Sequence, residues 1–251
     1  MKIEYYKEYS RYLNRDMEFK VYGHSGKPIL VFPCQDGRFF DYENQGMITT
    51  VQEYVDSGRI QFFCVDSIDK ESWSDKYGNP RHRSEMQENY FHYVCEEMVP
   101  HMFQISRDCN GGYQQKACTT GNSMGASHAL NFFLRRPDLF DSVIALSGIY
   151  ESTYFYGDYM DDLLYLNTPE LYMKNLSLDH PYIQLYNQSK IILCVGQGAW
   201  EDEMLASTHN MQKLFQEKGI SAWCDFWGKD VNHDWPWWRI QLPYFMKYIL
   251  D

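Results

Sequence analysis

The chain has 251 residues and carries 34 acidic against 23 basic side chains, so its formal net charge is −11. An aromatic fraction of 17% excludes an intrinsically disordered chain, because disordered segments are poor in aromatic residues. The acidic balance disfavours nucleic acids and anionic membranes as partners, since contact with phosphates requires Lys and Arg. We therefore expect a small or neutral molecule, or another protein, as the partner.

The length fits one domain that covers residues 1–251. The segment Met1–Glu8 has no apolar core typical of a signal peptide, and no apolar run approaches the ~20 residues of a membrane span. The seven cysteines are scattered and form no C-x-x-C pair, which favours reduced, buried thiols. These features predict a cytoplasmic protein. A homo-oligomer is one of the partner states we consider, and the sequence does not select an oligomeric state.

Hydrophobic patterning predicts a doubly wound α/β domain. The first segment, Tyr5–Val21, alternates charged and aromatic residues, as an antiparallel pair of edge strands would. Continuous apolar runs follow, and each is separated from the next by a longer and mostly amphipathic stretch. The runs are residues 28–33, 60–66, 116–120, 142–146, 190–195 and 222–227. Such runs are typical of parallel strands buried on both faces, and they place the functional site at the carboxyl ends of the strands.

A G-x-S-x-G pattern, Gly121-Asn122-Ser123-Met124-Gly125, follows the predicted strand that ends at Thr120. A serine at a sharp turn between a strand and a helix projects its hydroxyl above the sheet, and the glycines leave room for neighbouring backbone. The pattern therefore predicts Ser123 as a nucleophile. The alternative interpretation is a glycine-rich packing turn without chemistry.

A serine nucleophile needs a base and an acid, which in this topology follow it in the order acid, then histidine. Only His233 lies just past the last predicted strand, so it is the predicted base. The strand ending at Val195 leads into Glu201-Asp202-Glu203, from which we select Asp202 as the acid and Glu201 as the alternative. These carboxylates would equally suit the first turn of a helix, where acids are common.

Two donors are expected to stabilise the oxyanion that forms when the serine attacks an ester. One is the backbone N–H of Met124, the residue after the serine. The other should come from the loop after the first parallel strand, residues 34–38, where Gln35 and Arg38 are the candidates. No metal or dinucleotide motif occurs, so the chemistry is expected to need no cofactor.

Residues 150–188 are rich in Tyr and acidic side chains and lack the rhythm of strands and helices. We interpret them as a lid over the site or as an insertion that packs against the sheet. Trp235, Trp237 and Trp238 flank the predicted base, either to stack on a sugar ring or to hold His233 in place.

These motifs resemble the esterase family of α/β-hydrolases that includes esterase D (S-formylglutathione hydrolase), carbohydrate and feruloyl esterases and the mycobacterial mycolyltransferases. The resemblance rests on the Ser123 motif, on Gln197-Gly198 followed by Asp202, and on Asn232-His233-Asp234-Trp235 with the later Trp238-Arg239 and Leu242-Pro243. Gln197-Gly198 is similar to a Q-G-x-x-D segment that carries the acid, with one extra residue before Asp202. The resemblance implies an α/β-hydrolase fold and serine esterase chemistry.

The sequence thus predicts a serine carboxylester hydrolase that acts through Ser123, His233 and Asp202 on a small or carbohydrate-linked ester. Two alternatives use the same fold. An acyltransferase would deliver the acyl group to an alcohol in place of water, and a non-catalytic binding protein would keep the fold without the chemistry.

Overall fold

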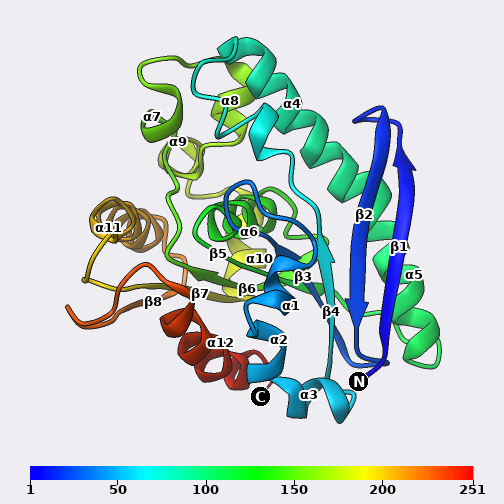
Figure 1. Ribbon diagram of the computed structural model, residues 1–251. Helices are drawn as coiled ribbons and strands as arrows, with labels where there is room; N and C mark the ends of the chain where they lie inside the picture. Colours follow the sequence, from blue (N-terminus) through cyan, green and yellow to red (C-terminus); the bar gives the residue numbers. More distant parts are fainter. Residues whose placement is uncertain (251) are drawn as a thin grey trace.

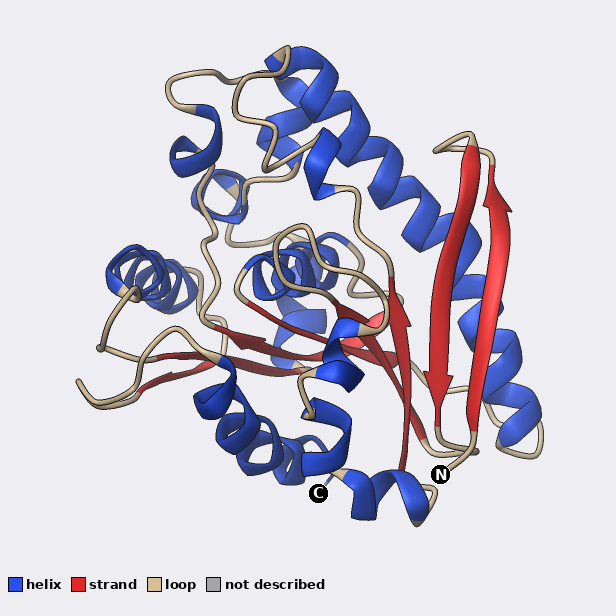
Figure 2. Cartoon of the chain, viewed as in Figure 1, coloured by secondary structure: helices blue, strands red, loops and turns tan. Residues whose placement is uncertain are grey.

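The computed structural model describes residues 1–250, in which one eight-stranded sheet runs through the molecule with helices on both faces (Figures 1 and 2). The strand order is β1-β2-β4-β3-β5-β6-β7-β8. The strands are β1 (Ile3–Ser10), β2 (Arg15–Tyr22), β3 (Lys27–Phe32), β4 (Ile60–Val65), β5 (Ala117–Asn122), β6 (Phe140–Leu146), β7 (Lys190–Val195) and β8 (Trp223–Phe226).

The N-terminal strands differ in direction from the rest of the sheet. β1 pairs with β2 in antiparallel register along its whole length, and β2 continues antiparallel to β4 from Phe19↔Val65 to Tyr22↔Phe62. The remaining neighbours pair in parallel: β4 with β3, β3 with β5, β5 with β6, β6 with β7 and β7 with β8. The predicted antiparallel start and parallel body are both confirmed.

Alternate residues of the central strands supply two separate cores, because successive side chains of a strand point to opposite faces. In β3, Leu30 and Phe32 enter the core on one face, whereas Ile29 and Val31 enter the core on the other. All four are fully or almost fully buried. Burial on both faces explains why the strands appear in the sequence as continuous apolar runs.

The helices divide between these two cores. One face carries α4 (Pro80–His92), a π-helical turn at Tyr93–Met98, α5 (Val99–Cys109), α6 (Met124–Arg135), α9 (Pro169–Asn175), α10 (Pro181–Asn187) and α11 (Asp202–Glu217). The other carries α1 (Asp41–Asn44), α2 (Met47–Thr50), α3 (Gln52–Asp56) and α12 (Trp235–Leu250). Within residues 1–250, no helix combines the length and the hydropathy that crossing a bilayer would require.

The segment between β6 and β7 forms four short helices, of which α7 (Thr153–Tyr156) and α8 (Asp162–Leu166) precede α9 and α10. The helices α7, α8 and α9 lie together in the upper left part of Figure 1, beside α4 and above α6. Several tyrosines of this segment are buried, among them Tyr150, Tyr156 and Tyr186. Much of the predicted insertion therefore packs against the domain, and only its first helix reaches the pocket described below.

Candidate active site

Ser123 occupies the tight turn between β5 and α6, with φ +56° and ψ −125°. A non-glycine residue rarely adopts this conformation, and it costs on the order of 1–3 kcal/mol. The turn is fixed on both sides, because the Ser123 N–H donates to the Leu146 carbonyl at 2.9 Å and the Ser123 carbonyl accepts from the Ala126 N–H at 2.9 Å. The G-x-S-x-G pattern thus lies in the strand–turn–helix context that its chemistry requires.

The two glycines of the motif are needed for close packing of backbone. A Cβ atom on Gly121 would lie 2.4 Å from the Gly125 carbonyl carbon, and one on Gly125 would lie 2.3 Å from the Phe32 carbonyl oxygen. Both distances are shorter than any van der Waals contact. Because the neighbours are backbone atoms of β3 and α6, they cannot move aside without displacing the turn.

We expect Gly125→Ala to lower the free energy of unfolding by about 1–3 kcal/mol, the usual cost of overpacking a core. The kcat of the folded enzyme should also fall, because the backbone shift that relieves the clash displaces Ser123. Thermal denaturation and steady-state kinetics measure the two effects. Ala126→Gly, one residue further along the same helix, is the control; normal activity in both variants would contradict the packing argument.

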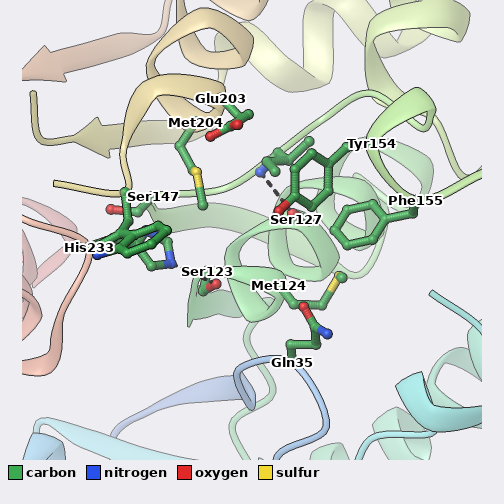
Figure 3. Close-up of a pocket in the computed structure, with 12 residues that line it drawn as sticks. Gln35, Ser123, Met124, Ser127, Ser147, Tyr154, Phe155, Glu203, Met204 and His233 are labelled. Atoms are coloured by element: carbon green, nitrogen blue, oxygen red, sulfur yellow. Dashed lines mark hydrogen bonds between the residues drawn. The ribbon is translucent and has the colours of Figure 1, made fainter. Parts of the chain in front are cut away.

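The imidazole of His233 lies next to the serine hydroxyl. His233 Nε2 is 2.9 Å from Ser123 Oγ, although the two residues are 110 positions apart in the sequence (Figure 3). The His233 N–H donates to the Ala199 carbonyl at 3.0 Å, which ties its loop to the loop after β7. The ring of Trp238 meets the imidazole edge-on at a centroid distance of 5.0 Å. The tryptophan therefore packs to hold His233.

The carboxylate that contacts His233 is that of Glu201, not that of Asp202. Glu201 Oε2 lies 3.3 Å from His233 Nδ1, and Glu201 is only 1% exposed. Asp202 is exposed and begins α11, the position of an acid that stabilises the positive end of a helix. The preference for Asp202 is thus corrected by the geometry, since successive residues at a helix start point in different directions. Counted from Gln197, the acidic position of the Q-G-x-x-D spacing falls on Glu201. This spacing is the signal in the sequence that points to Glu201 in place of Asp202.

Ser147, which follows β6, belongs to the same network and was missed in the sequence. Its hydroxyl donates to Glu201 Oε1 at 2.7 Å and accepts from Trp238 Nε1 at 3.2 Å. The Glu201 carboxylate is thereby held by one hydrogen bond to each oxygen, which fixes its orientation towards His233. No local motif marks Ser147, because its role depends on two partners distant in the sequence.

The glycines of Gly196-x-Gly198 serve close packing of two loops. A Cβ atom on Gly196 would lie 2.2 Å from the Val231 carbonyl oxygen, and one on Gly198 would lie 2.6 Å from the same atom. The Gly198 N–H donates to that carbonyl at 2.8 Å, and the Ala199 N–H donates to Asn232 Oδ1 at 2.8 Å. These contacts set the Glu201 loop against the His233 loop.

Two of the candidate oxyanion donors line the pocket in front of Ser123, and one does not. Met124 and Gln35 line it together with Ser123 and His233 (Figure 3). Within residues 1–250, the backbone N–H groups of Met124 and Gln35 have no hydrogen-bond acceptor, so both are free to donate to a ligand. Arg38 lies elsewhere and does not line the pocket.

The groups of Arg38 are engaged by other partners. Its Nε donates to Asp66 Oδ1 at 2.7 Å, and its Nη2 donates to Glu18 Oε2 at 2.6 Å. Its backbone N–H donates to Asp41 Oδ2 at 2.9 Å. The prediction of Arg38 as an oxyanion donor is therefore wrong, because the acidic side chains from β2 and from the loop after β4 hold it away from Ser123.

The pocket has a volume of ≈ 390 Å³ and a mixed polar and apolar lining. Tyr154 and Phe155 of α7 form one wall, and Met204 of α11 and Trp200 contribute to another. Trp200 lines the pocket although it is 82% exposed, and its backbone has the uncommon φ of +68°. The space in front of Ser123 suits a small organic molecule with an apolar part.

The cysteines are poorly suited to act as nucleophiles. Burial raises the pKa of the Cys34 thiol, which adjoins the pocket residue Gln35, and it raises the pKa of Cys95, Cys118 and Cys224 to about 12. At neutral pH these thiols are protonated, and the thiolate is the reactive form. We expect iodoacetamide at pH 7.5 to leave esterase activity unchanged; loss of activity in proportion to alkylation would indicate a thiol mechanism.

Among the described residues, no cluster of His, Cys, Asp or Glu has the arrangement of a metal site. The site in front of Ser123 is instead a chain of contacts that runs from Ser147 through Glu201 and His233 to the serine hydroxyl. A hydroxyl, an imidazole and a carboxylate in this order are the constellation used by serine hydrolases.

Fold and site together define an α/β-hydrolase of the serine type, and comparison with known proteins agrees. Residues 10–249 match the model of a family described as "Putative esterase", so the chain belongs to this esterase family and is a carboxylic ester hydrolase. No curated protein sequence matches the chain.

Solved structures share its fold at low sequence identity. A ferulic acid esterase is 16% identical with a TM-score of 0.75, over 99% of this chain and 97% of its own. An S-formylglutathione hydrolase from Agrobacterium tumefaciens is 14% identical with a TM-score of 0.74, over 99% and 94% of the two chains. MPT51 (FbpC1) from Mycobacterium tuberculosis is 12% identical with a TM-score of 0.70, over 100% and 98%. The α/β-hydrolase fold predicted from the sequence is confirmed.

Proposed function

We propose that the protein hydrolyses small carboxylic esters through a Ser123–His233–Glu201 triad and an acyl-enzyme intermediate. The observation that carries the proposal is the 2.9 Å contact between His233 Nε2 and Ser123 Oγ at the floor of an open pocket. Ser123 attacks the ester carbonyl while His233 accepts its proton. The imidazolium that forms then protonates the departing alcohol, and the acyl group remains on Ser123.

The second half of the cycle uses the same groups. His233 takes a proton from water, the resulting hydroxide attacks the acyl carbonyl, and Ser123 regains its proton as it leaves. Glu201 keeps Nδ1 protonated and stabilises the imidazolium in both halves. The N–H groups of Met124 and Gln35 are proposed to bind the oxyanion, and each such donor contributes about 3 kcal/mol to transition-state stabilisation.

The pocket supports an ester with a compact acyl group. Its volume of ≈ 390 Å³ accommodates a small ligand, and Tyr154, Phe155 and Trp200 offer faces for a ring or a short chain. Two neighbours are named as esterases of different substrates, ferulic acid esterase and S-formylglutathione hydrolase, so their names select no single ester. We also propose that the part of residues 150–188 around α7 covers this pocket, within a single domain spanning residues 1–251.

The test is rapid-mixing kinetics with p-nitrophenyl acetate. An acyl-enzyme predicts a burst of p-nitrophenol that approaches one equivalent per chain wherever deacylation is slower than acylation, followed by steady release of acetate. Absence of any turnover with p-nitrophenyl acetate, propionate and butyrate would contradict the proposal and favour a binding protein. Addition of methanol or glycerol distinguishes transfer from hydrolysis, because an acyltransferase forms the corresponding ester in preference to acetate.

A further inference from the structure

A second histidine–carboxylate pair lies beneath the site and takes no direct part in the proposed chemistry. His128 Nε2 is 2.9 Å from Asp69 Oδ1, and the two side chains are only 2% and 1% exposed. His128 lies on α6, the helix that begins after Ser123, and Asp69 belongs to a single 3₁₀ turn, Asp69–Glu71, after β4. Burial of two such polar groups is costly unless they meet specific partners.

The other oxygen of Asp69 holds the loop that carries Gln35. Asp69 Oδ2 accepts the backbone N–H of Asp36 at 3.3 Å. The hydroxyl of Ser74 donates to Asp36 Oδ1, and the Ser74 N–H donates to the Asp69 carbonyl at 2.9 Å. Asp36 is thus bound at both its backbone and its side chain by the segment that begins at Asp69.

The loop needs this support because its conformation is strained. The Gly37 N–H donates to the Cys34 carbonyl at 2.8 Å, so Cys34–Gly37 is a β-turn with Gln35 and Asp36 as its central residues. Asp36 has φ +58°. A positive φ at this third turn residue normally calls for glycine or asparagine, and the left-handed conformation costs another residue about 1 kcal/mol.

His128 itself is held rigidly. Its ring packs against Phe32, Tyr90 and Phe132 at centroid distances of 5.8, 5.8 and 6.4 Å. Phe32 ends β3, immediately before the loop that carries Gln35. A fixed imidazole on the nucleophile's helix therefore anchors Asp69, and Asp69 anchors the turn that brings Gln35 to the pocket.

We propose that Asp69 and His128 are positioning residues that set the oxyanion site by holding the Cys34–Gly37 turn at a fixed distance from Ser123. The pair acts through the Asp36 N–H and touches neither substrate nor Ser123. This inference rests on the proposed esterase function. It assigns a role in transition-state stabilisation to two buried residues, separate from the triad itself.

The test compares Asp69→Asn and His128→Gln with Glu88→Gln. Glu88 is a matched control because its carboxylate is also largely buried and binds the far end of the same helix through Arg135. We expect Asp69→Asn to lower kcat for p-nitrophenyl acetate by about 10–100-fold, part of the effect of losing an oxyanion donor, with KM changed less than about threefold. His128→Gln, whose amide can still donate to Asp69, should lose less.

Two further measurements separate positioning from a general loss of structure. A trifluoromethyl ketone forms a tetrahedral oxyanion on serine and so mimics the transition state. Its inhibition constant should rise by the same factor as kcat/KM falls, because catalysis depends on tight binding of the transition state. Asp36→Asn in the Asp69→Asn background should restore several-fold of the lost kcat, since asparagine adopts positive φ more readily and its Oδ1 can still accept from the Ser74 hydroxyl.

Equal losses in Asp69→Asn and Glu88→Gln would overturn the inference. A loss confined to KM, or no recovery with Asp36→Asn, would overturn it as well. The outcome is distinguishable from failure of the proposed function. A wild-type protein that shows neither turnover nor labelling by a fluorophosphonate contradicts the esterase mechanism, whereas an active wild type with a fully active Asp69→Asn variant contradicts only the role of this pair.

Discussion

Ser123→Ala should lower kcat for p-nitrophenyl acetate by about 10⁴-fold or more, the scale of loss when a serine hydrolase loses its nucleophile. The reason is that the proposed acyl-enzyme forms on the Ser123 hydroxyl, whose Oγ lies 2.9 Å from His233 Nε2. The chain should keep its fold, because the substitution removes one oxygen from a residue that lines an open pocket. Steady-state kinetics with a thermal denaturation control measure both.

Ser123→Gly sharpens this experiment. Ser123 has φ +56°, so a glycine at this position should raise the free energy of unfolding by roughly 1 kcal/mol while it abolishes turnover. A gain in stability together with a loss of activity is typical of a strained catalytic residue. Full activity in Ser123→Ala, or a variant that fails to fold, would contradict this account of the turn.

Glu201→Gln should lower kcat by about 10³–10⁴-fold, because an amide cannot stabilise the imidazolium and favours the wrong tautomer of His233. Asp202→Asn is the matched control, one residue away and with the same loss of charge. We expect it to retain activity within about twofold and to lose only a few tenths of a kcal/mol of stability from the start of α11.

A third variant, compared with Glu201→Gln and Asp202→Asn, tests the contact between Ser147 and Glu201. Ser147→Ala removes the hydroxyl that binds Glu201 Oε1, so it should reduce kcat by less than Glu201→Gln and by more than Asp202→Asn. The reverse order, with Asp202→Asn inactive and Glu201→Gln active, would restore the assignment that the sequence first favoured.

The strands were predictable from sequence because burial on both faces leaves a simple signature. Predicted runs such as 60–66 and 190–195 coincide with β4 and β7 to within one residue. The turn that holds Ser123 was also predictable, since the motif, a strand before it and a helix after it form one local unit. For these elements, short-range patterning carries most of the information.

Choices between neighbours were not predictable in the same way. Glu201 and Asp202 are adjacent, yet Glu201, at the N-cap of α11, is buried, whereas Asp202, in its first turn, is exposed. Arg38 illustrates a second cause of failure. Its position after β3 suggested an oxyanion donor, but Glu18 and Asp66, from two other segments, bind its guanidinium. Such long-range partners leave no local mark in a sequence.

The central claim is that Ser123 is a nucleophile activated by His233, and fluorophosphonate labelling followed by mass spectrometry tests it most directly. The account predicts one phosphonate adduct per chain, located on the peptide that contains Ser123. Labelling should be absent in Ser123→Ala and slowed by orders of magnitude in His233→Gln. An unlabelled wild-type chain, or an adduct that persists in Ser123→Ala, would contradict the claim.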